Sequence, residues 1–105
     1  MSFEDVELLL KTVSPNTHHF LAPKGTKAPW ITWAQHSSSG SYAGDRRYSE
    51  VQYGVVDLFT LSDPEPLKAK IETALAEAEV VFDLVAVQKE SDTGLYHYTW
   101  DIEVV

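Results

Sequence analysis

The side chains best suited to catalysis or metal binding in this sequence are its histidines. They are His18, His19, His36 and His97. Since His18 and His19 are adjacent, a strand would point their side chains to opposite sides, and they cannot both bind one ion. The spacings that usually place two histidines on one metal, HxH, HxxxH and HExxH, do not occur. The chain also has no cysteine, which excludes zinc–thiolate sites, iron–sulfur clusters and thiol nucleophiles. We therefore expect no metal site and no cofactor.

Asp57 is the carboxylate with the most unusual surroundings, because it interrupts an apolar run over residues 55–59. A partly buried carboxylate has a shifted pKa and marks a candidate site. Paired with a histidine, Asp57 would serve a small hydrolase or isomerase. The simpler interpretation is an aspartate near a strand end, solvated or paired with a lysine. Two further acids, Asp101 and Glu103, share one face of the final predicted strand, about 7 Å apart.

Motifs for a nucleophile or a nucleotide are missing from the sequence. Ser37, Ser38 and Ser39 follow one another, but no GxSxG elbow surrounds them. Neither GxxxxGK[ST] nor GxGxxG occurs, so nucleotide binding has no support. We therefore expect no catalytic residues, and a protein that is not an enzyme.

The chain of 105 residues has the size of a single domain, residues 1–105. Its sixteen acidic and eight basic residues give a net charge of −8. This charge argues against direct nucleic-acid binding, which depends on neutralising phosphates, and against docking on an anionic membrane. No apolar run approaches the roughly 20 residues of a membrane span. The acidic N-terminal segment is unlike a signal peptide, and we expect the protein to fold in a cytoplasm.

Two helices are predicted from capping signals and apolar stripes. The first spans about residues 3–12, with Ser2 as N-cap, Asp5 three positions on, and an apolar stripe that starts at Val6. The second begins at Asp63 as N-cap, has Pro64 in its first turn and runs to about residue 79. Its apolar stripe consists of Leu67, Ile71, Ala74, Leu75 and Ala78.

Five segments have strand character: residues 18–21, 30–36, 48–60, 80–89 and 95–105. The last is the clearest, because polar and apolar residues alternate along it, and the turn over residues 91–94 pairs it antiparallel with its predecessor. In the third strand Val56 and Leu58 face one way and the odd positions the other, and Gly54 is expected at a bulge. The serine- and glycine-rich segment 37–47 is expected to be a flexible loop.

These elements predict an α+β fold with the order α-β-β-β-α-β-β. Each helix has one apolar stripe, and the final strand has one apolar face. The economical arrangement is a mostly antiparallel sheet of four to five strands with two helices packed on one face.

A candidate interaction surface surrounds the serine-rich segment. Arg46 and Arg47 are the only arginines of the chain. They would either receive a carboxylate from a neighbouring subunit or pair with acids of their own chain, Asp45 or Glu50. Strand alternation puts Trp30 and Trp33 on opposite faces, which leaves one of them for a protein contact. The candidate interface residues are Trp30, Ser38, Ser39, Tyr42, Asp45, Arg46 and Arg47.

The order of these features resembles a family of viral proteins. A short helix leads to a Pro/Gly loop and a strand that opens with Ala28-Pro29-Trp30-Ile31. A Ser/Gly segment, Asp45-Arg46-Arg47-Tyr48 and the long strand 51–59 follow, and then a helix opening at Asp63-Pro64 and two closing strands. This pattern is similar to the tail-terminator and tail-completion (head–tail joining) proteins of long-tailed bacteriophages and prophages.

The resemblance implies a structural protein of the virion without enzymatic activity or cofactor. Members of this family form a ring, usually of six subunits, which caps the tail tube and offers a surface to the head connector. The expected partners are therefore further copies of the chain, the tail tube protein and the head connector protein. The expected location is the virion, and the host cytoplasm during assembly. Six copies at −8 each total −48, and we expect DNA to pass through an acidic lumen without binding. The alternative is a small regulatory α+β module that binds a protein or ligand at a sheet face around His97, Thr99 and Asp101.

Overall fold

The computed structural model describes the backbone of residues 1–43 and 46–105, and the side chains of residues 1–39 and 50–105. Two helices and five strands follow one another in the predicted order. They are α1 (Phe3–Val13), β1 (Thr17–His19), β2 (Trp30–Ala43), β3 (Arg46–Thr60), α2 (Pro66–Glu77), β4 (Val81–Lys89) and β5 (Tyr96–Val104).

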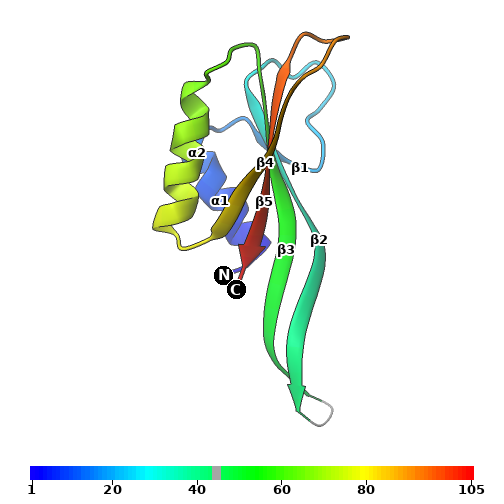
Figure 1. The fold of residues 1–105 in the computed structure, drawn as a ribbon, viewed down its shortest axis with the longest axis vertical. Helices are drawn as coiled ribbons and strands as arrows, with labels where there is room; N and C mark the ends of the chain where they lie inside the picture. Colours follow the sequence, from blue (N-terminus) through cyan, green and yellow to red (C-terminus); the bar gives the residue numbers. More distant parts are fainter. Residues whose placement is uncertain (44–45) are drawn as a thin grey trace.

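The five strands form one sheet with the order β1-β2-β3-β5-β4. The short β1 runs parallel to β2, and every other neighbouring pair is antiparallel. Both helices lie on the same face of the sheet, and the other face is left open (Figure 1). The predicted α+β fold with a mostly antiparallel sheet is therefore confirmed.

Helix α1 begins where the sequence predicts it. The Ser2 side chain accepts a hydrogen bond from the Asp5 amide, and the Asp5 carboxylate accepts one from the Ser2 amide at 2.8 Å. Phe3, Val6 and Leu10 are buried against the sheet, because they recur on one side of the helix. The predicted stripe is thus the side of α1 that packs on the core.

Helix α2 begins later than predicted. Its N-cap is Glu65, whose carboxylate accepts from the Leu67 amide, and Pro66 occupies the first turn. Both Asp63-Pro64 and Glu65-Pro66 satisfy the same capping rule, so the sequence alone does not choose between them. Burial opposes ionisation of Glu65, but hydrogen bonds from Thr60, the Leu67 amide and Ser62 outweigh it and lower its pKa. The hydrogen bonds from Thr60, at the end of β3, and from Ser62 hold Glu65 in place as the N-cap, so α2 begins after it.

The core lies between the helices and the sheet and is richest on β5. The predicted alternation of this strand is confirmed, because its even-numbered residues Tyr98, Trp100, Ile102 and Val104 are buried. The α2 residues Ile71 and Leu75 pack against the same cluster. Trp100 has the largest fully buried side chain of the described residues.

Two buried tryptophans differ in what their indole nitrogens contact. Nε1 of Trp100 donates to Glu72 at 3.0 Å, and Nζ of Lys68 lies 3.1 Å from the other Glu72 oxygen. Burial of Glu72 opposes its ionisation, but these hydrogen bonds and the Lys68 charge prevail and lower its pKa. Trp33 stacks on Phe3 and His19, and its Nε1 has no partner among the described atoms.

We expect Trp100→Phe to destabilise the protein more than Trp33→Phe. Both changes leave a small cavity, but only the first removes a donor from an ionised carboxylate, which is worth about 1.5–3 kcal/mol. Urea unfolding of the two variants measures the difference in the free energy of unfolding. Equal losses would mean that the Trp100–Glu72 bond contributes nothing.

Tyr98 makes the stability of the fold depend on pH in the alkaline range. Burial, the hydrogen bond that its hydroxyl donates to Asp63 and the charge of that carboxylate raise the pKa of Tyr98 to about 12. An unfolded tyrosine ionises near pH 10. The stabilisation is therefore complete below about pH 10 and is lost as the pH rises towards 12. We expect Tyr98→Phe to flatten this decline, measured as the melting temperature between pH 8 and pH 12. A parallel decline in the variant would show that other groups cause it.

The predicted loop over residues 37–47 is wrong for the described part of that segment. Strands β2 and β3 remain paired through it, from Ser37 opposite Tyr53 to Ala43 opposite Arg46. Serine and glycine are compatible with such a ladder, because its hydrogen bonds join backbone groups and need no apolar side chain. The paired strands project from the body, and the molecule measures 52 × 26 × 22 Å (Figure 1). We call residues 38–43 and 46–51 the arm.

Candidate functional site

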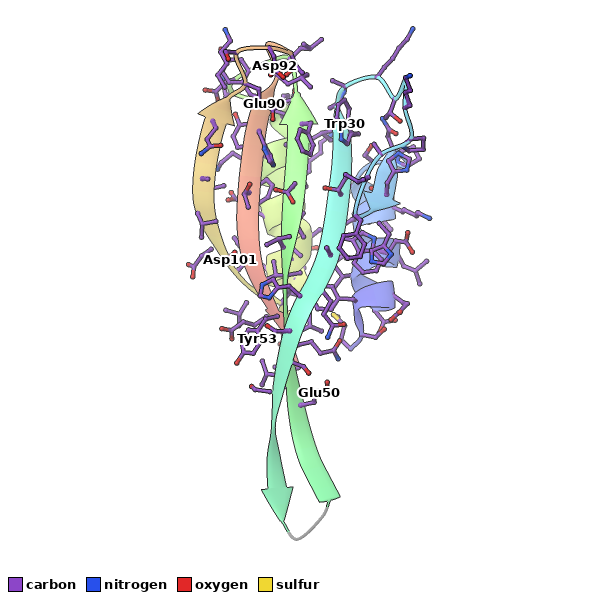
Figure 2. The ribbon with its side chains drawn as sticks, turned by 90° about the vertical axis from the view of Figure 1, so that its right-hand side faces the viewer. Trp30, Glu50, Tyr53, Glu90, Asp92 and Asp101 are labelled. Atoms are coloured by element: carbon purple, nitrogen blue, oxygen red, sulfur yellow. The ribbon has the colours of Figure 1, made fainter. Side chains whose placement is uncertain are left out.

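The predicted interface residues do not form one surface. Trp30 is at the start of β2, at the far end of the sheet from the arm, and its ring stacks on Phe59 with centroids 5.0 Å apart. Figure 2 shows Trp30 near one end of the sheet and Glu50 where the arm begins. The structure therefore separates Trp30 from the other candidates.

The remaining candidates belong to the arm. Ser38 and Ser39 are exposed, and Oγ of Ser39 lies 3.2 Å from the Tyr53 hydroxyl. For Tyr42, Arg46 and Arg47 only the strand backbone is described, and Asp45 lies outside the described residues.

The arm has strand edges that the body of the molecule does not cover. On one side, β1 pairs with β2 only from Ile31 to Trp33, so no described strand lies beside the next ten residues of β2. On the other side, pairing of β3 with β5 begins only at Gln52. Exposed strand edges of this kind readily pair with another chain.

Asp57 is at the centre of the open face and has two neighbours on β5. Its Oδ1 lies 2.7 Å from Nε2 of His97 and accepts a hydrogen bond from the Thr99 hydroxyl at 2.8 Å. Because an ionised carboxylate only accepts hydrogen bonds, Nε2 of His97 carries the proton in this contact. The Asp57 side chain is 18% exposed, so the predicted partly buried acid is confirmed. Its partners, however, are His97 and Thr99 and not a lysine.

Aromatic rings continue this cluster across the sheet. Trp30, Phe59 and His97 occupy one cross-strand row over β2, β3 and β5. The Phe59 ring stacks on Trp30 at 5.0 Å and on the His97 imidazole at 4.1 Å. The row holds His97 in place beside Asp57.

An aspartate bonded to a histidine is an element of acid–base catalysis, and the structure brings these two residues together as the enzyme alternative expects. The hydroxyl beside the pair is that of Thr99, which donates to Asp57 and lies 3.3 Å from Nε2 of His97, and no described hydroxyl is hydrogen-bonded to Nδ1 of His97. The neighbouring pocket of about 320 Å³ is lined by Trp30, Thr32 and Phe59 and not by the pair itself. The pair thus lies on an open sheet face.

The same pocket is bordered by an exposed apolar turn that sequence reasoning missed. Phe20 has a left-handed backbone with φ of 67°, and the Leu21 amide donates to the His19 carbonyl across it. A bulky residue in this conformation is rare and strained. Leu21 is 82% exposed and Phe20 is 61% exposed. No glycine or asparagine marks the turn, so the sequence carried no signal for it.

A second missed feature is a group of carboxylates beside the outer strand β4. Asp83 lies directly opposite Asp101, and Glu103 is two residues further along β5. We call these three residues the acidic notch; with His36 and Tyr53 they line a pocket of about 200 Å³. Within the described side chains none of the three has a cationic partner. Like charges directly opposite each other destabilise a sheet unless a cation offsets them. Figure 2 shows Asp101 and Tyr53 near the root of the arm.

A β-bulge creates the acidic notch. The register from Lys89 opposite Tyr96 shifts by one residue between Leu84 and Ala86, which leaves Val85 as the extra residue. Without the bulge, the register that starts with Lys89 opposite Tyr96 would continue unchanged along β4. Asp83 would then be opposite Ile102, and its side chain would face the core. The bulge turns the Asp83 side chain to the open face. A second bulge on β2, at His36, lies beside Gly54, so the predicted bulge is on the strand opposite the glycine.

The four histidines are distributed over the molecule. His19 stacks on Trp33, His18 bonds to Asn16, and His36 bonds to Ser37, all far in sequence from His97. Among the described residues, no group of three His, Asp or Glu side chains is arranged to hold a metal ion. No helix in the described part of the chain has the length and apolar character needed to cross a membrane.

Two comparisons with known proteins give no indication of the function. A scan against protein-family models finds no family that matches this chain. A search of curated proteins finds no match either.

Proposed function

We propose that this protein is a structural component of a tailed bacteriophage, which caps the tail tube as a ring and joins it to the head connector. The observation that carries the proposal is the combination of a projecting arm and an uncovered outer strand in one chain. The arm offers strand edges, and β4 at the other side of the sheet offers another. A chain with two different docking surfaces can associate head to tail, and such contacts close into rings.

The charge of the chain supports a passage for DNA through this ring. Each subunit has a net charge of −8, and an acidic lumen repels phosphate and lets a genome slide through. The proposal therefore assigns no direct nucleic-acid contact to the protein. A basic lumen in an assembled ring would contradict this part of it.

Electron microscopy of the purified protein with isolated tail tubes tests the proposal. We expect rings of regular size at one end of the tubes, and tubes that no longer lengthen when tail tube protein is added. Bovine serum albumin at the same concentration is the control for non-specific coating. Tubes that keep growing with no density at their ends would refute a capping function.

The second candidate function is a regulatory module that binds an apolar segment of another protein. The pocket beside Phe20, Leu21 and Trp30 favours it, because exposed apolar side chains around a hollow are typical of interaction sites. This function requires a stable monomer or dimer at micromolar concentration. Sedimentation velocity over a range of concentrations distinguishes it from a chain that assembles into rings.

The proposal assigns no reaction to Asp57 and His97. Asp57→Asn keeps the size of the side chain and one acceptor oxygen, so we expect ring formation and tube capping to be unchanged. An enzyme would lose its activity through this change while its assembly stayed the same.

A further inference from the structure

We propose that the pocket between the loop 20–29 and the open face of the sheet binds a short segment of another protein, in which an apolar side chain is flanked by carboxylates. We call this pocket the loop pocket. The inference rests on the second candidate function, whose pocket it uses, and adds the chemistry of the occupant. It holds or fails independently of tube capping.

The loop pocket is a hollow of about 320 Å³ with a largely apolar lining. Trp30 and Phe59 line it from the sheet, and their rings stack on each other, which keeps this wall rigid. Phe20 and Leu21 line it from the loop. The volume is at the lower end of the range typical of binding pockets, about 300–1,000 Å³. It therefore suits one large apolar side chain of a partner and not a whole helix.

The loop is fixed at both ends, so the pocket exists before a partner binds. Where the loop begins, the Phe20 amide donates to the Trp33 carbonyl at 2.9 Å. Where it ends, the side-chain amide of Asn16 donates to the carbonyls of Lys27 and Pro29, at 3.0 Å and 2.9 Å. A preformed site of this kind loses less conformational entropy on binding than a mobile loop does.

Two apolar side chains of the loop are exposed at the cost of backbone strain. Phe20 has φ of 67°, a left-handed conformation that suits glycine and disfavours a bulky residue. Its side chain and that of Leu21 are exposed, and neither belongs to the core cluster. A strained residue outside the core does little for the packing of the fold. Such a residue is more typical of a binding site.

Charge selects the kind of partner. Residues 8–44 contain no aspartate or glutamate, although the chain has sixteen acidic residues. Lys24 and Lys27 are exposed in the loop, directly beside residues that line the pocket, and neither is paired with a carboxylate of the described side chains. Asp57 lies in the next row of the sheet, but it does not line the pocket and is already bonded to its two neighbours on β5. Carboxylates beside the inserted side chain would therefore complement the loop, and cations would be repelled.

Other occupants fit these features less well. A membrane would gain only the two side chains of Phe20 and Leu21, while the net charge of −8 opposes approach to anionic lipid. Two copies that met loop to loop would bring their lysines together, which is unfavourable. A short acidic segment of a partner combines the apolar contact with opposite charge.

Selection from a library of random linear peptides tests the chemistry of the occupant. The peptides are sorted for binding to the purified full chain, and we expect enrichment of Leu, Phe or Trp flanked by Asp or Glu. Lys24→Glu and Lys27→Glu together are expected to reverse the preference, so that Lys and Arg flank the apolar residue. Lys11→Glu and Lys70→Glu, which change the net charge equally on the two helices, are the matched control and should leave the preference unchanged.

Two variants of the loop separate binding from folding. Leu21→Asp places a negative charge at the pocket and is expected to weaken binding of the most enriched peptide at least tenfold, measured by fluorescence polarisation of the labelled peptide. Phe20→Gly removes the ring and relieves the left-handed strain. We expect it to weaken binding similarly without lowering the melting temperature. In the parent protein, the peptide is expected to shift the amide NMR signals of residues 20–32 and of Phe59.

Several outcomes would overturn the inference. They are enrichment of basic or uncharged peptides, no enrichment, NMR shifts confined to the arm or β4, and a lowered melting temperature of Phe20→Gly. Leu21-dependent sedimentation with phosphatidylserine vesicles would assign the loop to a membrane instead, and loss of self-association in Leu21→Asp would assign it to a second copy. Tube capping by a Leu21→Asp protein that no longer binds peptide would support the inference and leave capping standing. Peptide binding by a protein that does not cap tubes would support the inference and refute capping alone.

Discussion

Replacing Gly54 by alanine is expected to lower the free energy of unfolding by about 3 kcal/mol, more than most single changes do. A Cβ atom at this position would lie 2.6 Å from Cζ and 2.7 Å from Cε1 of Phe3, and still closer to the Ala34 carbonyl oxygen. The Phe3 side chain is packed between α1 and the sheet, and the Ala34 carbonyl belongs to β2, which is paired with β3. Neither can move without disturbing the core, so the cost is steric. Guanidinium unfolding followed by tryptophan fluorescence measures the loss.

The matched control is Gly94→Ala in the β4–β5 turn. Gly94 has φ of 72°, and a Cβ there meets no atom within 4 Å. Its substitution therefore costs only the backbone strain, about 1 kcal/mol. Trimming the aromatic ring with Phe3→Leu is not expected to rescue Gly54→Ala, because the carbonyl of Ala34 remains in place. Full rescue, or equal losses at the two glycines, would contradict the steric explanation.

Shortening the arm is expected to abolish assembly and leave the body folded. Ser38 lies directly opposite Gln52, so replacing residues 39–51 by Asn-Gly closes the hairpin with a two-residue turn. None of the described side chains within residues 39–51 belongs to the core cluster. The free energy of unfolding should therefore change by less than about 1 kcal/mol, while rings and capped tubes disappear.

The turn between β4 and β5 provides the control for this deletion. The Glu90 amide donates to the Leu95 carbonyl at 2.8 Å, so replacing residues 91–94 by Asn-Gly shortens a hairpin in the same way at the other end of the sheet. This variant is expected to assemble like the parent protein. Sedimentation velocity and electron microscopy compare the three proteins. Assembly by the armless variant would remove the arm from the proposed function.

What the sequence predicted correctly depends on neighbours along the chain. The capping pair Ser2 and Asp5, the stripes of the two helices and the alternation of β5 are set by periods of 3.6 and 2 residues. These periods are properties of short segments, and so the elements and the α+β class could be predicted. The start of α2 failed for a related reason, since two Asp/Glu-Pro pairs lie within four residues and only contacts with Thr60 and Ser62 select the second.

The candidate site was only partly predictable because it is built from pairs distant in sequence. Asp57 stood out as an acid in an apolar run, but its bond to His97 spans 40 residues and depends on the register of β3 with β5. The sequence determined the helices, the strands and the surplus of negative charge. The tertiary structure alone decided that residues 37–43 extend β2 as an arm and that the bulge at Val85 turns Asp83 towards Asp101. One extra residue in a strand turns all the side chains that follow it to the opposite face of the sheet. The helix and strand periods of the sequence do not show where such a residue lies.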